Sequence, residues 1–349
     1  MIPSLIYQCF FVLINNKRTN VFPFFAMVRD LLTKAKLILP FIGLGILAYI
    51  FYSLDVHKIV SAFLSIQPFY ILYALLLTIP LLFIRNTAWL LILREQKIRT
   101  GFFRCMKIYL IGVFYGSISP GYVGQLMRVP YLKEKTGQPY GKLFVNTVIE
   151  TFVHTMSLYG MMIIGAVLAI ETMPQLLPIT IVWIVIITSV AVYFVRKERG
   201  EKPFRVLITY LIPKNVKRHF HEFVDTFYLD FPRFSAMIIP YLLGIITWVI
   251  VFSQEYMIVL GLGLGIPYFA FLFLFPIANT AGFLPITFAG LGIREGAAIY
   301  IFSTLFQAPG EKILVLSLVG FIVTDFFLGF LGFVLSLTES RSIVKIPEI

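Results

Sequence analysis

Long apolar runs occupy most of this chain and decide what it can fold into. Hydrophobic residues make up 59% of the 349 residues, and charged residues only 13%. A soluble domain cannot bury so much apolar surface, whereas a run of about 20 apolar residues crosses a bilayer as a helix. The sequence therefore predicts a polytopic membrane protein. The runs expected to be helical are 37–54, 69–93, 105–127, 143–170, 179–195, 236–260, 267–284 and 311–337.

The same runs indicate how the chain is divided. We expect an all-α membrane helical bundle of about seven or eight membrane segments, built as one domain over residues 27–338. Residues 1–26 are interpreted as an N-terminal extension without a role in the core. Their basic residues follow the apolar run instead of preceding it, unlike those of a signal peptide. Residues 339–349 are expected to form a short tail.

Basic residues between the runs predict the orientation. The segments 94–107, 128–142 and 196–233 carry five, four and nine Lys or Arg residues. Basic loops stay in the cytoplasm, so these three loops are expected there, in a multi-pass protein of the cell membrane. The net charge of +12 is accordingly interpreted as a topology signal and not as a nucleic-acid surface. Because two of these loops flank residues 105–127, that element is expected to be a re-entrant hairpin.

Two Pro/Gly-rich segments interrupt the apolar runs, and each leads to an arginine. The first ends at Arg128 and the second contains Arg294. A glycine lies four residues before each of them (Gly124 and Gly290), which is true of no other arginine in the chain. Broken helices at membrane depth are tolerated only where they pack in protein or line a cavity. Matched interruptions in two halves of a membrane protein indicate a transport site.

These segments predict a site for an anionic head group. The guanidinium groups of Arg128 and Arg294 offer planar forks of donors that suit a phosphate. Helix N-termini after the breaks, near Gly124, Gly290 and Gly292, would add backbone N–H groups. Together they would form an anion cradle at a midplane pocket. The alternative interpretation is that both arginines extend to the interface as anchors.

Further polar residues are expected to tune this pocket. Glu150 and His154 lie four apart and share a helix face with Asn146. They are candidates to pair with the arginines or to carry a proton, and the alternative is a polar seam between helices. Glu295 directly follows Arg294 and is a candidate to neutralise it in the absence of a ligand.

Three other polar residues lie within apolar runs. Glu255 and Asp325 each require a partner or a protonated state, and both proton coupling and structural hydrogen bonding stay open. Arg85, followed by Trp89, is interpreted as an interfacial arginine beside an aromatic belt.

The two motifs resemble those of a known family. Residues 120–128 are similar to the first motif of the lysylphosphatidylglycerol synthase transmembrane region, whose members are also called flippase-like integral membrane proteins. Residues 284–295 resemble its most specific signature, which ends Gly-x-Gly-x-Arg-Glu. Glu150 falls at the position of its Glu-Arg-x-x-Asp pattern, where this chain has Thr151 and His154 instead. The resemblance covers about residues 30–338.

The resemblance implies a helical domain that handles lipids. In fused relatives the domain moves an aminoacylated phospholipid between leaflets, and stand-alone members are thought to handle lipids or polyprenyl-linked intermediates. A soluble synthase domain is not expected here, so lysyl transfer by this chain is not expected either. The two departures at Thr151 and His154 bear on the charge network and on the substrate.

The leading hypothesis is a lipid translocase that binds the head group of an anionic phospholipid or a polyprenyl-phosphate lipid. An ATP-binding Gly-x-x-x-x-Gly-Lys-Ser/Thr motif does not occur, and neither a cofactor nor a metal site is expected. The alternatives are a membrane glycosyl- or phosphotransferase acting on polyprenyl phosphate, and a scaffold that recruits a glycosyltransferase through residues 196–233. An enzyme is the less favoured class, because no catalytic set is recognisable.

Overall fold

The computed structural model confirms the predicted all-α class. In the part of the chain that it describes, every regular element is a helix. The extension 1–26 and nearly all of the basic loop 196–233 lie outside that part. The structure describes residues 45–119, 122–195, 226, 232–283 and 290–343.

The helices follow the predicted apolar runs closely. In the first half they are α3 (Val56–Ser65), α4 (Pro68–Leu76), α5 (Thr78–Glu95), α6 (Phe102–Ser117), η1 (Val123–Met127), α7 (Arg128–Thr136), α8 (Tyr140–Leu168) and α9 (Leu176–Val195). In the second half they are η2 (Phe234–Met237), α12 (Ile238–Gly261), α13 (Tyr268–Ala281), α14 (Ile293–Phe306), α15 (Gly310–Phe321), η3 (Ile322–Phe326) and α16 (Phe327–Ile343).

Four of the described helices are long and apolar enough to cross a membrane by themselves. The number rises to five if the pair Gly45–Ser53 and Val56–Ser65, bent by 92°, forms one span. The predicted total of seven or eight membrane segments therefore requires shorter helices, such as α6, α9, α13 and α14, to enter the bilayer as well. The four long spans are Pro68–Glu95, Tyr140–Leu168, Phe234–Gly261 and Gly310–Thr338.

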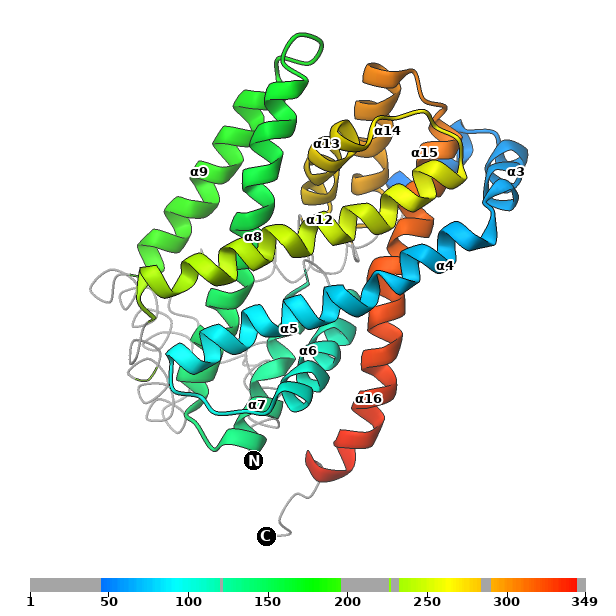
Figure 1. Cartoon of the computed structure of the whole chain (residues 1–349). Coiled ribbons are helices and arrows are strands. Elements are labelled where there is room, and N and C mark those ends of the chain that lie inside the picture. Colours follow the sequence, from blue (N-terminus) through cyan, green and yellow to red (C-terminus); the bar gives the residue numbers. More distant parts are fainter. Residues whose placement is uncertain (1–44, 120–121, 196–225, 227–231, 284–289, 344–349) are drawn as a thin grey trace, which may run out of the picture.

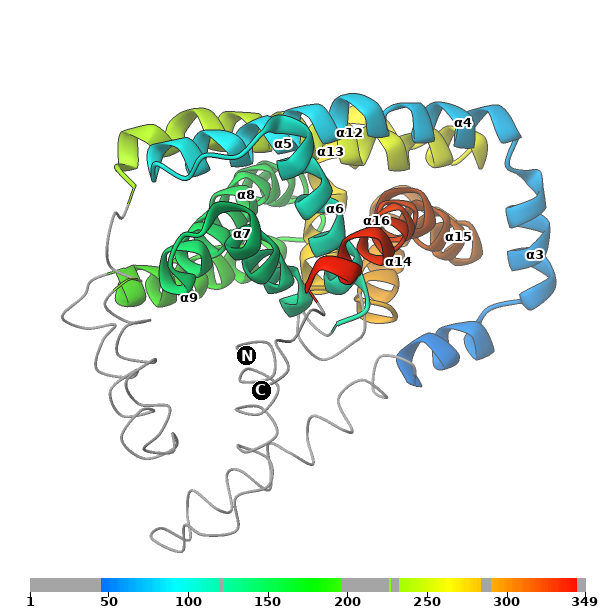
Figure 2. The ribbon, with the colours of Figure 1, turned by 90° about the horizontal axis from the view of Figure 1, so that it is seen from below.

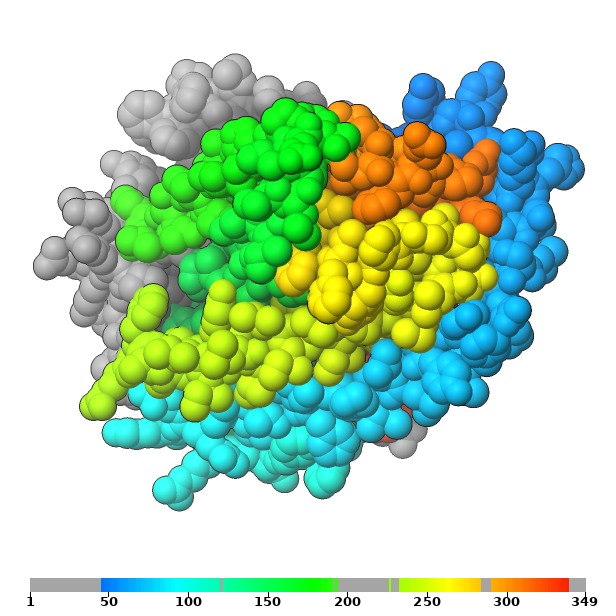
Figure 3. Space-filling view, turned by 45° about the horizontal axis from the view of Figure 1, so that its top comes forward, coloured from blue at the N-terminus to red at the C-terminus, as the bar shows by residue number. Residues whose placement is uncertain are grey.

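The long helices form the frame of the molecule. Helix α12 runs beside α4 and α5 and also packs on α8 (Figure 1). Seen from below, α4, α5 and α12 line one side, α7, α8 and α9 lie at one end, and α14, α15 and α16 lie toward the other (Figure 2). Helix α6 lies between these two groups and packs closely on α16. The space-filling view shows α12 between α4–α5 and the α8–α9 pair (Figure 3).

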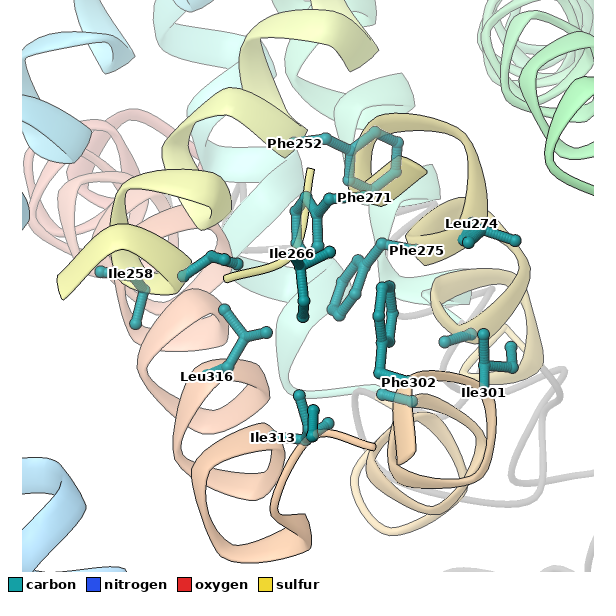
Figure 4. Packing of buried hydrophobic residues seen from close by; sticks show 14 of the residues in the cluster. Phe252, Ile258, Ile266, Phe271, Leu274, Phe275, Ile301, Phe302, Ile313 and Leu316 are labelled. Carbon is teal, nitrogen blue, oxygen red and sulfur yellow. The ribbon is translucent and has the colours of Figure 1, made fainter. Parts of the chain in front are cut away.

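An aromatic core fixes the second half of the bundle. Phe252 on α12, Phe271 and Phe275 on α13, and Phe302 on α14 are fully buried and contact one another (Figure 4). The rings of Phe271 and Phe275 stack with their centroids 4.9 Å apart. Stacked aromatic pairs of this kind contribute about 0.5–1.5 kcal/mol beyond their burial. The core therefore holds α13 and α14 together on either side of the second motif.

Each motif lies in a helix–break–helix hairpin. After α6 the chain turns back along it. The contacts of Gly116 with Gln125 and of Gly112 with Arg128 show this reversal. After α13 the chain also returns, and the backbones of Gly282 and Gly290 lie in close contact before α14 begins. The chain reversal predicted at the first motif is thus present, and a second one mirrors it. The turn residues 120–121 and 284–289 lie outside the described part.

Residues 128–142, predicted as a cytoplasmic connection between membrane runs, are helical for most of their length, and their side of the membrane stays a prediction. Helix α7 forms there because Val129, Tyr131 and Leu132 bury their side chains in a cluster with α5 and α6. The helix ends at Gly137, which has a φ of 69°, and Lys133 Nζ donates to the Gly137 carbonyl at 2.8 Å. A glycine in this conformation and a cation at the last turn both favour helix termination.

Candidate functional site

A first charge cluster joins three helices. Arg128, at the start of α7, donates from Nη1 to Glu150 Oε2 on α8 at 2.8 Å. Arg85 Nη2 on α5 lies 2.6 Å from the other oxygen, Glu150 Oε1, without a well-aligned hydrogen bond. The three side chains are buried, with 6% or less of their surface exposed. We call Arg85, Arg128 and Glu150 the first charge cluster.

The hairpin geometry leaves room for the Arg128 side chain. Gly112 on α6 lies against its aliphatic part, where any larger residue would overlap with Arg128 Cγ. Its guanidinium carbon lies 5.0 Å from the centroid of the Trp89 ring. Tyr109 contacts both arginines, at 5.6 Å from Arg85 and 5.9 Å from Arg128. Such cation–π contacts stabilise a buried guanidinium.

The first charge cluster has more positive than negative charge. Two guanidinium groups share the single carboxylate of Glu150. The remaining donors of Arg128 reach neutral groups: Nη2 donates to Gln125 Oε1 at 2.9 Å and to Thr151 Oγ1 at 3.3 Å. Arg85 Nε is buried and has no hydrogen-bond partner among the described residues. A buried donor without an acceptor is costly, so this position is suited to receive an anion.

A second charge cluster surrounds Arg294 on α14. Arg294 donates from Nη2 and Nε to Glu295 Oε1, at 2.7 and 3.1 Å, and its Nε also reaches Ser317 Oγ on α15 at 3.0 Å. Glu295 Oε2 accepts from the backbone N–H of Gly292 and so caps α14. Both side chains are almost completely buried. Arg294 is thus paired one to one with the adjacent residue.

Two more carboxyl groups belong to the second charge cluster. Glu255 on α12 and Asp325 in η3 both lie near enough to Arg294 to act on it electrostatically. The second charge cluster is therefore Glu255, Arg294, Glu295 and Asp325, with three acids and one base. It contains more acidic than basic groups, which is the reverse of the first charge cluster.

Aromatic side chains connect the two clusters. Tyr122, in the first motif, lies edge-on to Phe283, which precedes the second motif, with centroids 5.8 Å apart. Its hydroxyl donates to Asp325 Oδ1 at 3.5 Å. Trp248 on α12 lies 6.5 Å from Phe283 and stacks on His154 with centroids 4.5 Å apart. The two hairpins are thus neighbours, although Arg128 and Arg294 share no partner among the described residues.

The predicted site residues divide into two groups. Arg128 comes together with Glu150, and Arg294 with Glu295. His154 forms no ion pair in the described part; it lies one turn beyond Glu150 and is held by Trp248, whose Nε1 donates to the His154 carbonyl at 2.9 Å. A single cradle that contains both arginines stays a prediction.

The glycines of the motifs form backbone hydrogen bonds and close contacts that shape the two hairpins. Gly124 donates its N–H to Ser119 Oγ at 2.7 Å and packs against the Tyr115 carbonyl. Gly292 donates its N–H to Glu295. Gly290 has a φ of 76° and touches Gly282. The N–H groups of Gly124 and Gly292 are thus engaged within the protein, and the close approaches require the absence of a side chain.

Arg85 is the site residue that sequence reasoning missed. Its interpretation as an interfacial arginine is wrong, because the side chain is buried against Glu150. A signal was present in the sequence: Arg85 and Trp89 lie four residues apart and therefore share one face of α5. That face packs on the first hairpin, where both residues contact the same network.

Acidic, histidine and cysteine side chains do not gather into a group of three that could hold a metal ion, in the part of the chain that the structure describes. Asn146, which was expected on the same face as Glu150, serves a structural purpose. It accepts from Trp89 Nε1 at 2.9 Å and donates to Gln96 Oε1 at 2.7 Å, which ties α8 to α5 beside the first charge cluster.

Comparison with known proteins agrees with this architecture. The chain is 21% identical over 334 residues to the UPF0104 membrane protein MJ1595 of Methanocaldococcus jannaschii, an alignment that covers 91% of this chain and 99% of the relative. The family model described as "Lysylphosphatidylglycerol synthase TM region" matches residues 36–332, which include both hairpins and both charge clusters. The chain is therefore an integral, multi-pass membrane protein that belongs to the lysylphosphatidylglycerol synthase transmembrane-region family.

Proposed function

We propose that this protein moves an anionic lipid between the two leaflets of the cell membrane and holds the phosphate of its head group at the first charge cluster. The observation that carries the proposal is the charge balance there. Two buried guanidinium groups share one carboxylate, and Arg85 Nε has no acceptor in the described part. A buried excess of positive charge in a membrane protein is costly and marks functional sites.

A phosphate would supply the acceptor atoms and the negative charge that this cluster lacks. Its oxygens would accept from Arg85 Nε and would replace Gln125 and Thr151, the neutral partners of Arg128. Arginine and phosphate form short, charge-assisted hydrogen bonds, which are roughly twice as strong as those between neutral groups. The bound anion would also balance the second positive charge. Carboxylate ligands of similar size would gain less, because they offer fewer acceptor oxygens.

The first charge cluster lies close to the molecular surface. Thr151, which Arg128 reaches, is exposed on α8, and Gln125 is only partly buried. A head group would therefore displace one layer of neutral side chains to reach the guanidinium groups. The acyl or prenyl chains would stay in the lipid, because the surrounding surface is apolar. Exposed side chains near this point include Val123, Met127 and Val148.

Arg294 is the weaker of the two candidates for the head group. It is neutralised by Glu295 and held by Ser317, so its pair must open before a phosphate can bind. Gly290 and Gly292 support this hairpin in the proposal, and Gly124 supports the first. Glu150 sets the charge of the first cluster, and His154 borders it. Arg294 would therefore assist at a later step than Arg128.

The family relationship supports a lipid as the substrate. Its printed description names a lysylphosphatidylglycerol synthase, and both lysylphosphatidylglycerol and its anionic precursor phosphatidylglycerol carry a phosphate that the first charge cluster could bind. Phospholipids and polyprenyl phosphates share that phosphate. The experiment therefore compares both kinds of lipid.

The test uses purified protein in liposomes that contain a fluorescent phosphatidylglycerol or a fluorescent polyprenyl phosphate, with a quencher that reaches only the outer leaflet. We expect the protein to accelerate exchange of at least one of the two lipids over protein-free liposomes. Arg85→Gln keeps the Arg128–Glu150 pair and should lower the rate at least about tenfold, the value of one charged hydrogen bond. Arg94→Gln, an exposed arginine on the same helix, is the matched control.

Exchange at the rate of protein-free liposomes for both lipids would contradict the proposal. Full activity of Arg85→Gln would contradict the assignment of the head group to the first charge cluster. Formation of a glycosylated or phosphorylated product by the purified protein would favour a transferase instead.

A further inference from the structure

Glu255 is a buried acid that forms no ion pair with the residues that the structure describes. It lies in the C-terminal half of α12, and only 3% of its surface is exposed. Its Oε2 atom has no hydrogen-bond partner among the described residues. Gly320 on α15 leaves space for the carboxyl group, because a methyl group there would lie 3.2 Å from Glu255 Oε1. The described part of the fold therefore leaves room for the carboxyl group but supplies no hydrogen-bond donor to its Oε2 atom.

The positive charge that acts on Glu255, that of Arg294, is already paired with another acid. Arg294 makes its ion pair with Glu295, whose oxygens also accept from Ser317 and Gly292. Among the described elements packed around α12, the charged groups that act on Glu255 are Arg294, Asp325 and Glu295. The second charge cluster is neutral only if Glu255 and Asp325 both carry a proton or a cation.

The two remaining acids differ in their surroundings. Asp325 is partly buried and accepts from Thr324 Oγ1 at 3.1 Å and from the Tyr122 hydroxyl at 3.5 Å. Glu255 has no such donor at Oε2 and lies deeper. An ionised carboxylate in this position would be strongly disfavoured, whereas a neutral carboxylic acid would not. Glu255 is therefore the group that fits a proton best.

The backbone beside these acids contains an irregular helical turn. Asp325 belongs to η3, a single π-helical turn inserted between α15 and α16. Such turns within helices are frequently found at functional sites. The contacts of Tyr122 with Asp325 and Phe283 connect this turn to both hairpins. Movement of either hairpin would therefore alter the surroundings of the acids.

We propose that Glu255 binds and releases a proton during the transport cycle, so that a proton gradient drives the movement of the lipid; this inference rests on the proposed lipid translocation. With its proton bound, Glu255 leaves the Arg294–Glu295 pair closed. After the proton leaves for the opposite aqueous phase, the Glu255 carboxylate competes with Glu295 for Arg294 and loosens the second hairpin. The only bond made and broken is the O–H bond of the carboxyl group.

The test first asks which fluorescent lipid, phosphatidylglycerol or polyprenyl phosphate, the wild-type protein exchanges. It then measures the final distribution of that lipid between the leaflets of proteoliposomes, with a pH difference of known sign and the membrane potential clamped by potassium and valinomycin. One proton per lipid corresponds to a shift of about tenfold in the leaflet ratio per pH unit. We expect a shift for the wild-type protein that reverses when the gradient reverses. Glu255→Gln should still exchange lipid but reach the same ratio under both gradients. Glu134→Gln, an exposed acid on α7, should behave as the wild type.

A wild-type protein that exchanges lipid but gives one leaflet ratio under both gradients overturns proton coupling and leaves the proposed function standing. A gradient response that persists in Glu255→Gln overturns the assignment to this residue. Absence of any wild-type exchange overturns both proposals. The wild-type measurement decides about coupling even if the variant proves unstable.

Discussion

The two hairpins resemble each other in sequence and differ in charge. Each contains the pattern Gly-x-x-x-Arg, and each buries its arginine beside a glutamate. In the first, Glu150 comes from another helix and is shared by Arg128 and Arg85. In the second, Glu295 is the next residue after Arg294, and further acids lie close by. The first charge cluster therefore has more basic than acidic groups, and the second has more acidic than basic groups; the two proposals rest on this difference.

The repeated motif thus fixes a backbone shape and not a chemical task. The motif glycines permit the close approaches on which both hairpins depend, since a side chain at Gly124 would overlap with the Tyr115 carbonyl and one at Gly290 with Gly282. The charge of each site is set by residues outside the motif, such as Arg85 and Glu255. Equivalent substitutions in the two clusters test whether this difference in charge holds.

The largest expected effect on stability comes from removing the shared carboxylate. Glu150→Gln leaves two buried guanidinium groups without a counter-charge and should lower the free energy of unfolding by about 3–5 kcal/mol. Glu295→Gln should cost less, because Glu255 and Asp325 can supply negative charge to Arg294. Reversible unfolding in mixed detergent micelles measures both values. A larger loss for Glu295→Gln than for Glu150→Gln would contradict the proposed difference between the two clusters.

Substitution at the second hairpin tests its backbone. Gly290→Ala introduces a side chain at a φ of 76° and against Gly282, so the free energy of unfolding should fall by about 2–4 kcal/mol. Gly137→Ala is the matched control, because Gly137 has a similar φ of 69° and open space around it. Equal losses in the two variants would show that the contact with Gly282 contributes nothing.

The contact between Gly112 and Arg128 tests the packing of the first hairpin. Gly112→Ala places a methyl group against the Arg128 side chain and should cost about 1–3 kcal/mol of unfolding free energy. Gly101→Ala, at the start of the same helix, meets nothing within 4 Å and should be nearly neutral. Because the arginine is displaced, lipid exchange by Gly112→Ala should fall as well. Unchanged exchange would separate the position of Arg128 from the activity.

The smallest expected change in stability is that of Glu255→Gln, which contrasts with Glu150→Gln. Glu255→Gln replaces a carboxyl group whose Oε2 has no partner by an amide of the same shape. The free energy of unfolding should stay the same or rise by about 1 kcal/mol, since no ion pair is broken. The same replacement at Glu150 is strongly destabilising in this account. A loss of several kcal/mol in Glu255→Gln would reveal a hidden partner for Glu255.

The fold class followed from the sequence because apolar runs and their Pro/Gly breaks act locally. The chain reversal at Arg128 could also be predicted, since basic segments flank it on both sides. Helix α7 could not be separated from a loop, because its apolar residues are few and its helix depends on packing against α5 and α6. The position of Arg85 was missed for a similar reason: its partner Glu150 lies far along the chain, and only tertiary packing brings them together.

The most direct measurement compares Arg128→Lys with Arg294→Lys in the leaflet-resolved exchange of fluorescent phosphatidylglycerol. Both variants keep the charge and lose the planar fork that suits phosphate. If the first charge cluster holds the head group, Arg128→Lys lowers the initial rate at least about tenfold, whereas Arg294→Lys stays within about threefold of the wild type. Equal losses, or a greater loss in Arg294→Lys, would contradict the assignment of the head group to the first charge cluster.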